Sequence, residues 1–112
     1  MKEPENVAVL ITAGSDDEAQ RIADELTKQR KAACVSIIRN IHSLFWWEGK
    51  IDSASEVLLI AKTKVSQLSG LIKLVKELHS YDVPEVIALP IVGGNQDYLD
   101  WIGNVLGEKQ GS

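Results

Sequence analysis

Cysteine is almost absent from this 112-residue sequence, in which Cys34 stands alone. One thiol cannot close an intrachain disulfide, so a disulfide-stapled scaffold is excluded. Long apolar runs are also lacking, and no stretch approaches the roughly 20 apolar residues of a membrane-spanning helix. The first six residues are polar, unlike the apolar core of a signal peptide. We therefore expect a cytoplasmic protein without a membrane partner.

The sequence also lacks an excess of positive charge. Twelve Lys and Arg residues stand against sixteen Asp and Glu residues, giving a net charge of -4 at pH 7. Nucleic-acid binders are usually basic, because phosphate neutralisation supplies most of their non-specific affinity. Nucleic acid is therefore not expected as a partner. With 45% apolar residues, the chain has the composition of one globular domain. We expect this domain to span residues 1–112, with loose ends at 1–6 and 107–112.

The hydrophobic periodicity predicts the element order β-α-β-β-α-β-α. The first six elements form the split βαβ pattern of the ferredoxin-like fold. The predicted class is therefore α+β: a βαββαβ antiparallel sheet with two helices on one face, plus a short C-terminal helix. Pro90 lacks a backbone donor, which predicts an edge, a bulge or a strand end. The expected strands cover residues 7–12, 32–47, 51–62 and 86–92, and the expected helices follow Ser15, cover residues 65–79 and begin at Asp97.

The predicted hairpin is unusually long, since ordinary strands rarely exceed about ten residues. Its outer part carries large apolar side chains close together, at Leu44, Phe45, Trp46 and Trp47. In a lone domain, these side chains and the strand edges would be exposed. A second copy of the chain would cover them. We therefore expect a homo-oligomer with these four residues at its interface.

Several short motifs follow one another along the chain. They are KAACV at 31–35, WEGKI at 47–51, EVLLIAKT at 56–63, HSYDVPE at 79–85, IALPI at 87–91 and YLDWI at 98–102. In this order and spacing they resemble the signatures of the CutA family of divalent-cation tolerance proteins. The resemblance implies a ferredoxin-like domain assembled as a compact homotrimer, with long hairpins pairing across subunits. It also implies a link to tolerance of copper and other divalent ions, and no known reaction, so we do not expect an enzyme.

The resemblance also bears on metal ligands. The copper ligands proposed for some family members correspond here to Ile11, Leu78 and His79, of which His79 alone has a ligating side chain. The proline that commonly follows this histidine is replaced by Ser80. Cys34 offers a soft thiolate ligand for copper. The predicted ligands of copper or another divalent cation are thus His79 and Cys34. The alternatives are a helix C-cap for His79 and a small buried apolar residue for Cys34.

Two functional hypotheses follow. The first is a trimeric protein of divalent-metal tolerance, with copper as the leading ion. The second is a sensor, similar in architecture to the PII signalling proteins, that binds a small anionic metabolite in clefts between subunits. An acyl-phosphate hydrolase ranks below both, because Asp16 and Asp17 follow the first strand where that chemistry would need an arginine. No nucleophile and base stand in a recognisable arrangement.

Overall fold

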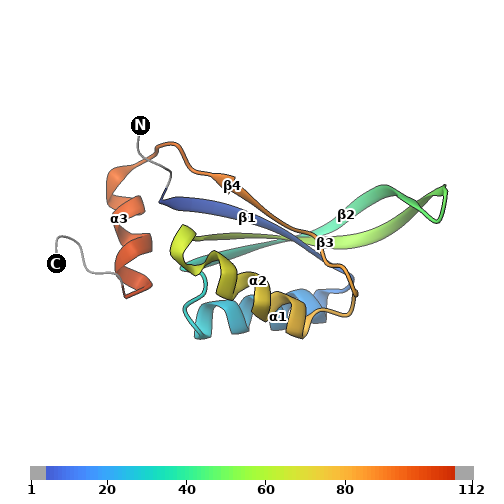
Figure 1. Ribbon diagram of the computed structural model, residues 1–112, viewed down its shortest axis with the longest axis horizontal. Helices are drawn as coiled ribbons and strands as arrows, with labels where there is room; N and C mark the ends of the chain where they lie inside the picture. Colours follow the sequence, from blue (N-terminus) through green and yellow to red (C-terminus); the bar gives the residue numbers. More distant parts are fainter. Residues whose placement is uncertain (1–4, 108–112) are drawn as a thin grey trace.

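The computed structural model describes residues 5–107 as a four-stranded sheet with three α-helices (Figure 1). The element order confirms the predicted β-α-β-β-α-β-α arrangement. Of the predicted loose ends, residues 1–4 and 108–112 lie outside the described residues, whereas Asn6 already belongs to the first strand. The elements are β1 (Asn6–Ala13), α1 (Asp16–Lys28), β2 (Cys34–Trp47), β3 (Lys50–Lys64), a 3-10 turn (Val65–Gln67), α2 (Leu68–Leu78), β4 (Val86–Pro90) and α3 (Gln96–Val105).

The sheet has the strand order β2-β3-β1-β4, and every neighbouring pair of strands is antiparallel. Together with the element order, this confirms the predicted ferredoxin-like α+β class. β4 forms one edge of the sheet, and Pro90 is its last residue, opposite Val7. A proline at the end of an edge strand removes no ladder hydrogen bond that the sheet needs, as predicted from the sequence.

One face of the sheet is covered by α1 and α2, which lie side by side beneath it in Figure 1. Alternate side chains of the central strands point toward these helices, because successive residues of a strand face opposite sides. Burying each large aliphatic side chain contributes about 1.5–3 kcal/mol, so this layer is the main source of stability. The fully buried residues of this core include Val9, Ile11, Leu59 and Ala61 from the strands and Ile22, Leu26, Leu71 and Val75 from the helices.

The ends of α1 are set by local hydrogen bonds and backbone conformation. The helix begins after the N-cap Ser15, whose Oγ accepts a hydrogen bond from the Glu18 N–H at 3.1 Å. Its last helical residue is Lys28, and Arg30 then adopts a left-handed φ of 55°, which an α-helix cannot continue. None of the helices within residues 5–107 is long and apolar enough to cross a membrane.

The hairpin of β2 and β3 continues beyond the end of β1. The last residue of β1, Ala13, pairs with Val57, and no third strand of residues 5–107 accompanies the hairpin past this point. We call this extension the arm; it comprises residues 41–47 and 50–56. Figure 1 shows the arm projecting past both helices, while α3 stands at the opposite end of the sheet. The predicted long hairpin is therefore confirmed, and it makes the molecule 51 Å long but only 22 Å thick.

Candidate functional site

The second face of the sheet is mostly apolar and largely uncovered. Cross-strand pairing places Leu10 between Ile60 and Ile87 on this side. Ile87 and Leu89 remain 48% and 45% exposed. A contiguous apolar surface of this kind marks an interaction site. We call it the open face; its residues are Ala8, Leu10, Ile38, Leu58, Ile60, Ile87 and Leu89.

The four residues predicted at an interface all lie on the arm and are exposed. Leu44, Trp46 and Trp47 are 67%, 73% and 61% exposed, and Phe45 is 38% exposed. Because side chains alternate along a strand, Phe45 and Trp47 project from one side of the arm, and Leu44 and Trp46 from the other. Apolar surface is thus present on both faces of the arm. A partner must cover the arm from two sides to remove this surface from water.

His79, a predicted metal ligand, is the C-cap residue of α2, and its side chain is fully buried. Its Nδ1 accepts a hydrogen bond from the Tyr81 N–H at 3.0 Å. Its Nε2 therefore carries the proton of the neutral ring and donates it to the Thr12 carbonyl oxygen, 2.6 Å away. The ring uses both nitrogens to join the end of α2 to the end of β1. A metal ion could bind this ring only if one of the two hydrogen bonds were broken.

Glu18 reaches the same region from the first turn of α1. Its Oε1 accepts from the Gly14 N–H at 3.0 Å, and its Oε2 accepts from the Ser80 N–H at 2.8 Å. Oε1 also lies 3.9 Å from Nδ1 of His79. Burial alone raises the pKa of Glu18, but the hydrogen bonds from Gly14 and Ser80 outweigh it. The net result is a pKa below the ordinary value, so the ionised carboxylate stabilises the fold.

Tyr81 connects this region to the base of the arm. Its hydroxyl donates to Oε2 of Glu56 at 3.0 Å, and Glu56 is only 8% exposed. Burial, the hydrogen bond to Glu56 and the negative charges of Glu56 and Glu18 raise the pKa of Tyr81. The hydroxyl also passes close to Gly14, where an added Cβ would lie 3.2 Å from it. A side chain at Gly14 would therefore press against the Tyr81–Glu56 hydrogen bond.

We call Glu18, Glu56, His79 and Tyr81 the His79 cluster. The carboxylate of Glu18 and the ring of His79 are both occupied by backbone partners. In the part of the chain that the structure describes, no three His, Cys, Asp or Glu side chains are grouped so that they could hold a metal ion. The hydrogen bonds of Glu18 and His79 connect β1, α1 and the segment after α2 to one another. The sequence pointed to His79 and to its neighbour Tyr81, but not to the contacts with Thr12 and Glu18, because these residues lie far from His79 along the chain.

Cys34, the second predicted ligand, lies far from His79. It is partly buried at the start of β2, where Nζ of its pairing partner Lys62 lies 3.8 Å from its Sγ. Thr12, which holds the His79 ring, pairs instead with Leu58 of β3. The four-residue offset between Lys62 and Leu58 corresponds to about 13 Å along a strand. Within one chain, the two predicted ligands are therefore not brought together.

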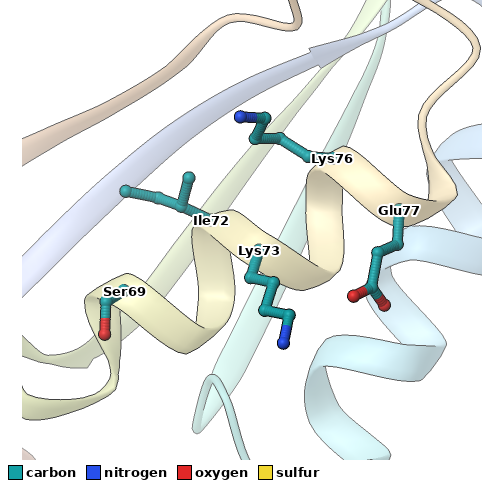
Figure 2. A pocket seen from close by; sticks show the side chains of 5 residues that line it. All are labelled: Ser69, Ile72, Lys73, Lys76 and Glu77. Carbon is teal, nitrogen blue, oxygen red and sulfur yellow. The ribbon is translucent and has the colours of Figure 1, made fainter.

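A pocket of about 350 Å³ lies on the outer side of α2. Figure 2 shows that its five side chains all project from this one helix, with Lys73 and Lys76 pointing in different directions. Ligand sites need polar groups that converge on a common point. Because these groups diverge, we do not consider the pocket a binding site.

Comparison with known proteins identifies the family. Residues 7–105 match the family model described as CutA1 divalent ion tolerance protein. The chain belongs to the CutA1 family. A relative from rice, "Protein CutA 1, chloroplastic", is 46% identical over 99 residues, which cover 88% of this chain and 56% of the relative. The "Divalent-cation tolerance protein CutA" of Thermus thermophilus is 45% identical over 94 residues, covering 84% of this chain and 91% of the relative.

A solved structure agrees with this membership in CutA1. The crystal structure of CutA1 from Oryza sativa matches with a TM-score of 0.89 at 43% identity, covering 96% of each chain. The chain spans just over half the length of its rice and Arabidopsis relatives, and most of the length of the Thermus relative. The family predicted from the motifs is therefore confirmed. The names of these relatives refer to divalent-cation tolerance or to CutA, and not to a reaction.

We expect Glu18→Gln to lower the free energy of unfolding at pH 7 by about 1–3 kcal/mol, because its amide offers only one acceptor for two backbone donors. The pKa of Glu18 is lowered in the folded state, so its stabilisation is present at neutral pH. That stabilisation is lost as the pH falls through the folded-state pKa. The difference between wild type and variant should therefore shrink in acid, as measured by urea unfolding at fixed protein concentration.

The matched control for this prediction is Asp17→Asn, which removes an acid from the same helical turn at an exposed position. We expect it to change the unfolding free energy by less than about 1 kcal/mol. Equal losses for both variants at every pH would contradict the role given to Glu18.

Proposed function

We propose that this chain acts in the cytoplasm as a homotrimer that contributes to divalent-cation tolerance without catalysing a reaction. The open face and the arm carry the proposal, because a single chain leaves both apolar surfaces in water. The number three comes from the family resemblance, and the tolerance role from the names of the relatives. Self-association is the part that the geometry supports most directly.

A second copy fits these surfaces for reasons of size and symmetry. The arm is about 23 Å long, since each strand residue spans about 3.3 Å. A four-stranded sheet is about 15–20 Å wide at the usual strand spacing. One copy's arm is thus long enough to cross the sheet of its neighbour. A closed symmetric assembly would let every copy both give an arm and receive one.

The strand edges support the same proposal. β2 and β4 form the two edges of the sheet, and both edges of the arm lack a neighbouring strand within residues 5–107. Unpaired edge strands invite pairing with another chain. Pairing between copies would satisfy these backbone groups while the apolar side chains of the arm are buried.

We expect the purified chain to sediment at about three times its mass of 12.3 kDa. Ile87→Lys should shift it to the mass of one chain, because burying an unpaired ammonium group in an apolar contact is strongly unfavourable. Ser69→Lys is the matched control, since it adds the same charge at an exposed position on the outer side of α2. A wild-type monomer, or an Ile87→Lys variant that still assembles, would contradict the proposed interface.

The role of divalent cations in this proposal comes from the family, since no three metal-ligating side chains are grouped into a metal site among residues 5–107 of one chain. Ile11, at a position of the family's proposed copper ligands, is fully buried in the aliphatic core. His79 and Cys34 stay predicted ligands, each as a separate one-residue site. A single imidazole or thiolate is a small part of the three or four ligands that metal sites use. Stronger binding would need ligands from more than one copy.

A copper competition titration against a chelator tests the predicted ligands. If they bind copper, His79→Ala should weaken Cu(II) binding and Cys34→Ala should weaken Cu(I) binding, each by at least about tenfold, or 1.4 kcal/mol. His42→Ala is the control, because His42 is the other histidine and lies exposed on the arm. Wild-type protein that cannot compete with the chelator, or variants that bind as wild type does, would rule out both residues as ligands.

A second candidate function is a sensor for a small anionic metabolite, and Lys62 favours it. Its ammonium group is partly buried on the side of the open face, and the contact found for it within residues 5–107 is Sγ of Cys34. In a cleft between copies, this cation would be available to a carboxylate or a phosphate. The open face would then supply the apolar wall of the cleft.

Thermal-shift measurements with nucleotides and organic acids test this candidate. An anion bound at Lys62 should raise the melting temperature of the wild type, because binding to the folded state stabilises it. Lys62→Gln should abolish the shift, and Lys73→Gln, on the outer side of α2, should retain it. The absence of any shift in the wild type, or a shift kept by Lys62→Gln, would contradict the sensor hypothesis.

A further inference from the structure

β2 contains one residue more than its ladder with β3 requires. Ile38 pairs with Leu58 and Ile41 pairs with Glu56, so two residues of β2 stand opposite the single residue Val57. Asn40, one of the two, has a left-handed φ of 61°. Asparagine is among the few residues that accept this conformation without glycine's freedom. The irregularity is therefore a β-bulge, which bends its strand and increases the local twist.

The bulge lies where the arm leaves the sheet. Val57, the residue opposite the bulge, is also the partner of Ala13, the last residue of β1. From this point outward, no third strand of the described chain restrains the hairpin. Figure 1 shows the arm curving away beyond the end of β1. A bend at this position therefore redirects the whole arm.

Side-chain contacts hold the base of the arm on both strands. On β2, Nε of Arg39 lies 3.4 Å from Oδ1 of Asp16 in the first turn of α1. Both side chains of this pair are more than half exposed, so it contributes little. On β3, the buried Glu56 accepts the hydrogen bond of Tyr81 at 3.0 Å. The N–H of Tyr81 in turn donates to His79, which contacts Thr12 of β1 and Glu18 of α1. The base of the arm is therefore connected to β1 and α1.

We propose that the bulge at Arg39 and Asn40, together with the Glu56–Tyr81 contact, fixes the direction of the arm, and that assembly of the copies depends on this direction. The inference rests on the proposed self-association. Both sides of the arm are apolar, so apolar character alone does not select one orientation. A directed arm places its apolar residues against the neighbour's sheet, and a misdirected arm leaves them in water. The bulge is in this sense a positioning element of the interface.

Deletion of Asn40 changes the direction of the arm but keeps its apolar side chains. Without this residue, Ile38 still pairs with Leu58 and Ile41 with Glu56, and each side chain keeps its face of the hairpin. The deletion therefore removes the bend but no apolar side chain. We expect it to weaken self-association by at least about 100-fold, measured by sedimentation over a range of protein concentrations. Circular dichroism and thermal unfolding report whether the variant is folded.

Two substitutions complete the experiment. Asn40→Gly accepts a left-handed φ and should assemble as the wild type does. Asn40→Val resists this φ and should weaken assembly by at least about tenfold, and it decides the question if the deletion variant does not fold. Folded variants that assemble like the wild type would overturn the role of the bulge while leaving self-association intact. A wild type that is monomeric at all concentrations would instead overturn the proposed self-association, and this inference with it.

Discussion

Two helices of this size can cover only one face of a four-stranded sheet, and this constraint governs the molecule. Alternation of side chains along each strand produces two faces, and both are apolar here. The helix-covered face holds the core, with Ile11 and Leu59 fully buried. Within residues 5–107, the other face and the arm are left largely exposed. The proposed assembly would bury the apolar surface that the helices leave exposed, and burial of such surface is the main driving force of association.

The His79 cluster is the point at which the layers are connected. His79 joins α2 to β1, Glu18 joins α1 to the segment after α2, and Tyr81 extends the connection to Glu56 at the base of the arm. Most of these contacts involve buried or partly buried groups, where unsatisfied partners are costly. The same contacts that complete the fold therefore also restrain the arm. This gives the histidine a structural reason to be present, independent of any metal.

Much of the architecture could be predicted from the sequence, because local patterns determine it. The strand β1, the capped start of α1, the long hairpin and the end position of Pro90 all agree with the prediction. The motifs also identified the family, which the match over residues 7–105 confirms. The exposed apolar residues of the arm could also be predicted from a local pattern. The hairpin is longer than ordinary strands, and its outer part carries the apolar run from Leu44 to Trp47, which a lone hairpin cannot bury.

The sequence by itself therefore determined the elements, their order, the fold class and the family, because these depend on periodicity and on residues near one another in the chain. The tertiary structure alone decided which side chains meet. It separates Cys34 from His79, because Cys34 pairs with Lys62 of β3, whereas Thr12, which accepts from the His79 ring, pairs with Leu58 of β3. It joins Nε2 of His79 to the Thr12 carbonyl oxygen of β1, and it places the bulge at Asn40 across β3 from the end of β1. Such contacts depend on strand register and on segments distant in sequence, for which a single chain of residues carries no local signal.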